Sequence, residues 1–145
     1  MNTTLSRCLQ FRTAKFDYNS ELPAEYNAGN RFYGRDVAEF VSEGLSAAGM
    51  NADFLDEDWG WLVQGTDIAA RPFEVAIYNL SEHGEGARPG VDTWGLWVRA
   101  YESKKVLRLF SKRREVTVPH QFITAIEGLF TAEGIRLQAW SDGPQ

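Results

Sequence analysis

Two stretches of the chain repeat apolar residues with the period of an amphipathic helix. Across residues 36–48 they recur at intervals of three and four, and Gly49 follows where a helix commonly ends in a left-handed residue. The second stretch has Thr117 as its expected N-cap, Pro119 in its first turn and Gly134 after its end. We therefore expect two helices, each with one buried face.

Elsewhere the apolar pattern changes to a period of two, which is typical of strands. Strands are expected at residues 9–16, 59–64, 73–80, 94–101 and 135–140. Two of these, 73–80 and 94–101, are apolar on both faces and belong in the centre of a sheet. Loops rich in glycine, proline and polar residues are expected at 17–34 and 81–92.

The segment 103–116 fits two structures. Val106, Leu107 and Phe110 would anchor a short helix, whereas Val106, Arg108 and Phe110 fit a strand. We favour the helix, because its many basic side chains would then stay in water while the apolar residues hold it to the body.

The order of these elements predicts an α+β fold. Consecutive strands joined by short turns pair antiparallel, and an amphipathic helix must cover its apolar side against another element. We expect a two-layer sandwich, with a mainly antiparallel sheet and two amphipathic helices on one face. A chain of 145 residues, 43% of them hydrophobic, is expected to form a single domain over residues 1–145.

Charge is distributed unevenly along the chain. Residues 1–70 hold five basic and eleven acidic side chains, a net charge of −6, and residues 71–145 hold ten and nine. The overall charge of −5 argues against binding to nucleic acid or to an anionic membrane. The basic stretch 104–114 contains a single aromatic residue for base stacking, Phe110, so it is more simply a solvated face.

The expected location is the cytoplasm. No apolar run approaches the roughly 20 residues that span a bilayer, and residues 1–10 lack the features of a signal peptide. A single cysteine, Cys8, cannot form an internal disulfide, which suits a reducing compartment.

Two groups of tryptophans stand out. The first lies in the run Asp56-Glu57-Asp58-Trp59-Gly60-Trp61. Its tryptophans share one strand face, so they either form an aromatic hot spot beside an acidic lip or fill the core, and the core is the simpler interpretation. Trp94 and Trp97 instead alternate, so either one lies inside and the other outside, or the strand is covered on both sides. An exposed Trp97 beside Arg99 and Tyr101 would line a ligand groove or a dimer contact, but core packing is again the simpler interpretation.

An acidic residue followed by Asp-Trp-Gly-Trp at the start of a strand resembles a motif of a group of small bacterial proteins. The resemblance covers roughly residues 34–140 and includes the strand 94–101, the basic stretch and the ending 135–140. It implies a bacterial origin and the α+β fold. The group has no established activity, so the resemblance implies no catalytic residues. Some small bacterial proteins of this general type are similar to immunity or inhibitor proteins.

Signals for catalysis are missing from the sequence. It contains no phosphate-binding loop, dinucleotide fingerprint, nucleophile elbow or zinc-protease motif. His83, His120 and the scattered acids lack the spacing of metal ligands, and Cys8 is best read as a small buried hydrophobe. We therefore expect a protein without enzymatic activity, metal or cofactor.

Our leading hypothesis is a cytoplasmic bacterial protein that docks on another protein, such as an immunity or inhibitor protein that caps a basic toxin or enzyme. The expected docking residues are Asp56, Glu57, Asp58, Trp59 and Trp61. An alternative contact for an acidic partner consists of Lys104, Lys105, Arg108, Lys112, Arg113 and Arg114. The runner-up is a small-molecule binder or minor enzyme with an aromatic groove. A third possibility is a structural or self-associating module, which would form a dimer through an exposed sheet edge or a helix face.

Overall fold

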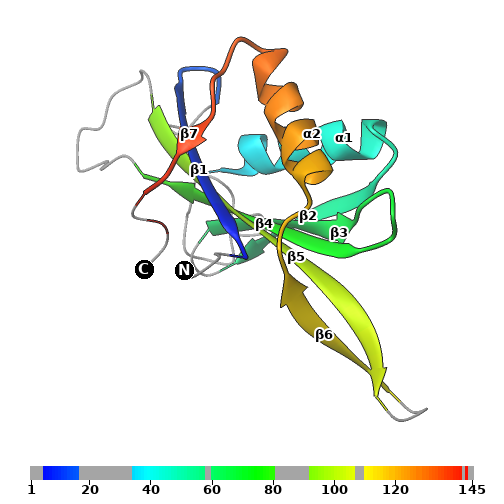
Figure 1. Ribbon diagram of the computed structural model, residues 1–145. Coiled ribbons are helices and arrows are strands. Elements are labelled where there is room, and N and C mark those ends of the chain that lie inside the picture. The colour runs from blue at the N-terminus through cyan, green and yellow to red at the C-terminus, as the bar shows by residue number, and fades with distance from the viewer. Residues whose placement is uncertain are drawn as a thin grey trace.

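The computed structural model describes residues 5–16, 34–57, 60–80, 92–106, 110–141 and 143. These residues form an α+β fold with seven strands in one mainly antiparallel sheet and two helices (Figure 1). The elements are β1 (Arg7–Thr13), α1 (Arg35–Ala47), β2 (Asn51–Glu57), β3 (Gly60–Thr66), β4 (Pro72–Asn79), β5 (Asp92–Val106), β6 (Phe110–Val116), α2 (His120–Thr131) and β7 (Gln138–Ala139).

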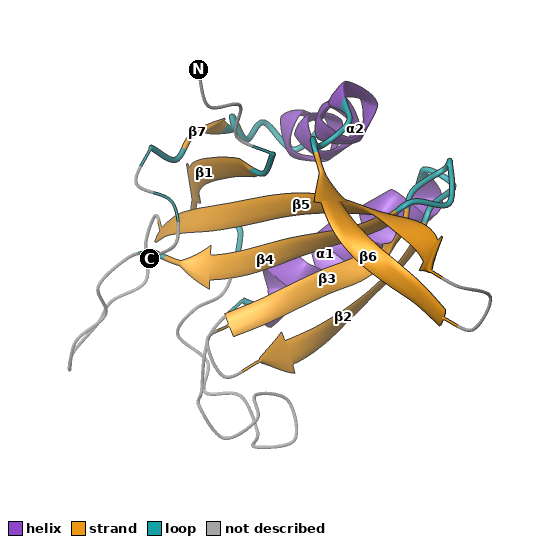
Figure 2. Ribbon diagram, turned by 60° about the horizontal axis from the view of Figure 1, so that its bottom comes forward, coloured by secondary structure: helices purple, strands orange, loops and turns teal. Residues whose placement is uncertain are grey.

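The long strand β5 organises the sheet, whose order is β2-β3-β4-β5-β1-β7 with β6 also paired to β5. Along one side of β5 lies β4. Along the other side, β1 pairs with residues 92–98 and β6 takes over from residue 100 to residue 106. Because β1 ends where β6 begins, the far part of β5 leaves the body with β6 as a two-stranded hairpin (Figure 2).

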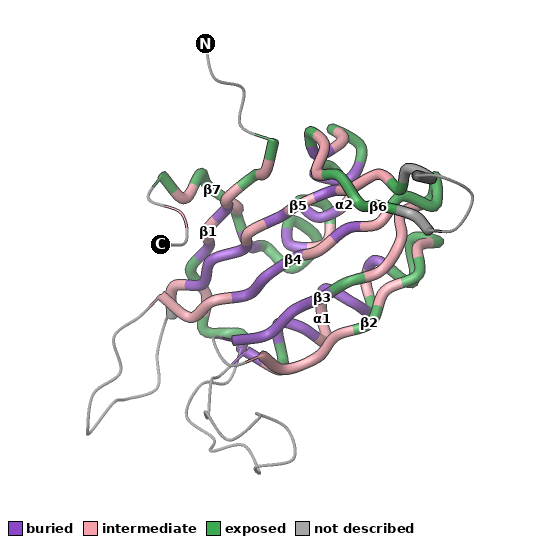
Figure 3. Tube along the Cα trace, turned by 90° about the horizontal axis from the view of Figure 1, so that it is seen from below, coloured by how far each residue is buried: buried purple, intermediate pink, exposed green. Residues whose placement is uncertain are grey.

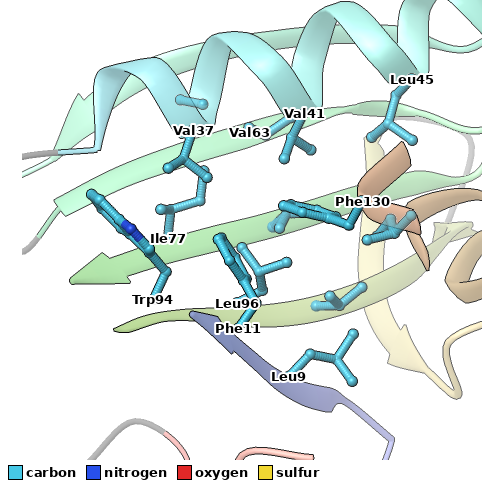
Figure 4. Close-up of a cluster of buried hydrophobic side chains, with 14 of the residues drawn as sticks. Leu9, Phe11, Val37, Val41, Leu45, Val63, Ile77, Trp94, Leu96 and Phe130 are labelled. Carbon is cyan, nitrogen blue, oxygen red and sulfur yellow. The ribbon is translucent and has the colours of Figure 1, made fainter. Parts of the chain in front are cut away.

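One face of the sheet carries the core. Register places Ile77 opposite Trp61 on one side and Leu96 on the other, with Leu9 opposite Leu96 in turn. The buried apolar side chains of α1 and α2 join this cluster; Figure 4 shows Val37, Val41 and Leu45 of α1 with Phe130 of α2. Buried positions gather in β3, β4 and β5 (Figure 3), as two-sided apolar runs predict for central strands.

Both expected helices are present, and α1 ends as the sequence predicts. The N–H of Gly49 donates to the carbonyl of Ser46 and that of Met50 to the carbonyl of Leu45, which together form a Schellman motif. Gly49 has φ 96°, a conformation in which a side chain is strained. For α2, the expectation of Thr117 as N-cap is wrong, because Pro119 occupies that position and no side chain caps the helix.

The expectation of a helix at residues 103–116 is also wrong. This segment is the end of β5 and all of β6, with Val106 paired to Phe110 and Tyr101 to Glu115. A helix would keep these basic side chains in water, but a hairpin that projects from the sheet also does so, as the exposed Lys112, Arg113 and Arg114 show. In the hairpin, the backbone of β6 is satisfied by pairing with β5. A short helix would satisfy its own backbone, but only three apolar residues would anchor it to the body.

Other strands differ from expectation at their ends. The sequence pattern missed β2 altogether, because Asn51–Glu57 holds three acids, yet it pairs with all of β3. The last strand shrinks to the two residues of β7, and β1 begins and ends earlier than expected. The expected loops 17–34 and 81–92 lie outside the described residues, except for their last residues, Gly34 and Asp92.

The burial pattern predicts a sharp contrast between two isoleucines. Ile77→Ala removes a side chain that is 0% exposed in the core, and we expect a loss of about 2–5 kcal/mol in the free energy of unfolding. The matched control Ile68→Ala changes a side chain that is 74% exposed and is expected to stay within about 0.5 kcal/mol of wild type. Urea denaturation measures both, and similar losses in the two variants would contradict this core.

Candidate functional site

The acidic–tryptophan motif does not form one surface. Trp61 lies in the core at 2% exposure, tilted against Phe54 with 6.0 Å between ring centroids. This burial excludes Trp61 from a docking surface, and core packing is what the structure shows for it. Asp56 and Glu57 are half-buried at the end of β2, whereas Asp58 and Trp59 lie outside the described residues.

Gly60 explains the close packing at this point of the sheet. A Cβ atom there would lie 2.5 Å from the carbonyl oxygen of Ile77, a contact that real side chains do not make. The glycine at this position therefore permits the close approach of the neighbouring backbone.

The sheet face opposite the core, which we call the outer face, carries a polar and aromatic group. Trp94 is fully buried and Trp97 is half-buried on the outer face, so the two tryptophans lie on opposite faces of β5, as their alternation predicts. Register places Glu74 directly opposite Arg99 on adjacent central strands. We call the following set the outer-face cluster: Glu74, Trp97, Arg99, Tyr101 and Arg113.

Its members form a continuous chain of contacts. The guanidinium of Arg99 lies over the Trp97 ring, 3.9 Å from the centroid, and its Nη2 is 3.7 Å from Glu74 Oε1. The hydroxyl of Tyr101 donates to the same oxygen at 2.6 Å. Arg113, which β6 supplies, stacks over the Tyr101 ring at 4.1 Å. Two cations thus hold the faces of two aromatic rings, a contact that grows stronger as water is removed.

Burial tightens the electrostatics of this cluster. The side chains of Arg99 and Glu74 are 21% and 17% exposed, so water screens their attraction only partly. Burial, followed by the hydrogen bond to Glu74, raises the pKa of Tyr101 to about 12. Arg99 Nε is buried and has no hydrogen-bond partner among the described residues. Glu74 thus accepts the Tyr101 hydroxyl and forms an ion pair with Arg99, which ties the three side chains together.

The projecting β5–β6 hairpin and the outer face meet at an angle and form a corner between them. Figure 1 shows the hairpin leaving the sheet on the side away from the helices. Where hairpin and sheet meet, Arg113 and Asp53 line an open pocket of about 340 Å³, together with Gln64 and Phe73. Asp53 and Arg113 are both exposed and no ion pair joins them. The corner thus offers an acid and a base to whatever enters it.

The far end of the outer face is closed by aromatic packing. Tyr78 and Trp140 meet with 5.7 Å between ring centroids, beside Gly95. Cys8 lies opposite Trp97 in the register and is half-buried, so burial raises the pKa of its thiol. Burial therefore disfavours the thiolate form of Cys8.

Three of the six basic residues expected as an alternative contact lie on β6. Lys112, Arg113 and Arg114 are exposed on β6, and Arg114 forms an exposed ion pair with Glu102 across the hairpin. The side chains of Lys104 and Lys105, and all of Arg108, lie outside the described part.

An apolar groove lies on the helical side of the molecule. It has a volume of about 390 Å³ and lies between the end of α1, the β3–β4 turn and the start of α2. Ile68, on its rim, is 74% exposed, while Phe122 and Met50 lie deeper.

The described residues contain no group of three His, Cys, Asp or Glu side chains placed to hold a metal ion. Nε2 of His120 lies 3.5 Å from the Thr124 hydroxyl, and His83 lies outside the described ranges. In the part of the chain that the structure describes, the helices are too short and too polar to cross a membrane.

Sequence reasoning named Trp97, Arg99 and Tyr101 together but missed Glu74, which connects them. A signal was present: Glu74 is the one charged residue in the otherwise apolar strand β4. A lone carboxylate in a central strand needs a partner, because burying an unpaired charge is costly. That argument identifies the need for a cation but not which neighbouring strand supplies it.

Tyr101 makes stability depend on pH in the alkaline range. Its pKa is about 12 in the folded protein against 10.0 in the unfolded chain, so its contribution is complete below pH 10 and is lost as the pH rises to about 12. We expect Tyr101→Phe to lose less stability than wild type across that window, measured by urea denaturation at each pH. A wild type and variant with parallel pH profiles would contradict the shifted pKa.

Gly95 is expected to tolerate no side chain. A Cβ atom there would lie 2.7 Å from the Trp140 ring, so Gly95→Ala should displace that ring and cost about 1–3 kcal/mol of stability. The control is Gly128→Ala within α2, where nothing lies within 4 Å and removal of a helical glycine should stabilise by about 0.5–1 kcal/mol. Thermal unfolding compares the two, and equal effects would show that Trp140 does not pack on Gly95.

Comparison of the chain with protein-family models, with curated proteins and with solved structures found no match. The resemblance to small bacterial proteins stays a prediction that rests on the motif itself.

Proposed function

We propose that this protein is a non-catalytic binding protein that docks another protein in the corner between the outer face and the β5–β6 hairpin. In this proposal the fold is a two-layer sandwich whose helices both cover the core face, which leaves the outer face to a partner. The observation that carries the proposal is the outer-face cluster, which holds two cation–aromatic pairs at 3.9 Å and 4.1 Å in a fixed arrangement.

Tryptophan, tyrosine and arginine are the residues that most often dominate binding energy at protein interfaces. Here they are held in place before binding, because Glu74 receives both Arg99 and Tyr101. A fixed arrangement lowers the entropy that a partner's binding must overcome. The basic hairpin beside the cluster favours a partner with an acidic surface.

An immunity or inhibitor role in the cytoplasm is the most specific form of the proposal. The form in which an acidic lip caps a basic enzyme has less support, because Trp61 lies in the core and Asp56 and Glu57 are half-buried. It stays a proposal for those two carboxylates.

A small-molecule site is the second candidate, and the 340 Å³ pocket beside Arg113 favours it. Asp53 and Arg113 would hold opposite charges of one polar ligand there. A protein partner explains more of the cluster, because Trp97 and Arg99 are not among the residues that line this pocket.

The proposal is tested by capture of partners from a lysate of the organism that carries the gene, at low and at high salt, followed by affinity measurements. We expect a partner lost at high salt, and a dissociation constant raised at least tenfold by Trp97→Ala and by Arg113→Ala. The matched controls are Ile68→Ala, an exposed apolar residue elsewhere, and Arg136→Ala, an exposed base elsewhere.

Equal affinity in Trp97→Ala and wild type, or equal weakening by the controls, would overturn docking at this corner. If no protein is captured in either buffer, tryptophan fluorescence with a metabolite library tests the pocket instead. Arg113→Ala should then abolish the response.

A further inference from the structure

Three strands of the sheet have one unpaired side among the described residues: β2, β6 and the two-residue β7. Among the described residues, β2 pairs only with β3, and β6 pairs only with β5. Both strands have seven residues, so they offer edges of equal length. An unpaired edge presents a row of backbone N–H and C=O groups that another strand can extend.

These two edges carry opposite charge. Strand β2 itself holds three acidic and no basic side chains, and Arg35 of α1 lies over the ring of its Phe54. Residues 102–115 of the hairpin hold six basic and two acidic ones. On β2 Asp53 is exposed, and on β6 Lys112 and Arg114 are exposed, with Arg114 in an ion pair with Glu102 of β5.

We propose that the protein associates with itself by adding β6 of one copy to the β2 edge of a second copy. The inference concerns the margins of the sheet and does not depend on docking at the outer face. Cross-strand pairs of opposite charge stabilise a sheet, and like charges opposite each other destabilise it. Charged edges usually prevent edge-to-edge pairing. Here the edge charges disfavour pairing of β2 with a second β2 and of β6 with a second β6, but they favour pairing of β6 with β2.

The contact is heterologous, because it joins two different surfaces. Each pairing leaves one β2 edge and one β6 edge free, so assembly continues into a ring or an open chain of copies. The attraction comes from exposed charges, so it weakens as salt screens them. Association should therefore depend on both protein concentration and ionic strength.

Sedimentation velocity of the full chain over a range of concentrations tests the proposal. At low salt we expect species larger than a monomer, with a dissociation constant at least tenfold higher at high salt. The β6 variant Lys112→Glu/Arg114→Glu and the β2 variant Asp53→Lys/Glu57→Lys should each remain monomeric where wild type associates.

An equimolar mixture of the two variants is the decisive sample. It pairs an acidic β6 with a basic β2 and a basic β6 with an acidic β2, so association should return. A wild type that stays monomeric at low salt, variants that associate like wild type, or a mixture that stays monomeric would each overturn the proposal.

Circular dichroism checks that the variants keep the fold. If either one unfolds, Lys112→Gln/Arg114→Gln and Asp53→Asn/Glu57→Gln replace them, and each must weaken association for the proposal to stand. Trp97→Ala should leave association unchanged, which separates this result from docking at the outer face.

Discussion

Strand β5 is the constraint on which the rest of the structure depends. It has fifteen residues, and no partner strand is more than about half as long, so it must exchange partners along its length. Its first half holds β1 and its second half holds β6, while β4 follows it on the other side. The same strand therefore supplies core residues such as Leu96 and, five residues later on the opposite face, Tyr101 at the base of the hairpin.

The alternation of β5 also separates two kinds of energetics. Trp94, Leu96 and Val98 face the core and are fully buried, where each contributes through the apolar area it removes from water. Trp97, Arg99 and Tyr101 face the other way, and their contacts are electrostatic and directional. A cluster of this kind adds little to stability compared with the core, but it fixes side chains in one arrangement, which is what recognition of a partner requires.

Charge separation is the second theme of the molecule. Acidic residues gather in α1 and β2, and basic residues gather on the hairpin, whose Arg113 lines the corner pocket together with Asp53 of β2. With a net charge of −5 the chain repels copies of itself on average, so any self-association must rely on orientation and contact between unlike margins. The outer-face cluster adjoins the basic hairpin, because Arg113 of β6 stacks over the Tyr101 ring.

The sequence by itself determined the α+β class, both helices and the central position of β4 and β5. The reason is that apolar residues follow the buried faces of each element, so local periodicity and two-sided apolar runs indicate burial directly. The sequence also determined that Trp94 and Trp97 lie on opposite faces. Only the tertiary structure decided the fate of 103–116, because basic residues stay solvated in either a helix or a hairpin and the deciding hydrogen bonds come from β5. It alone joined Glu74 to Arg99 and Tyr101 and gave β2 its place, since strand pairing brings together residues whose spacing in the chain carries no trace of their contact.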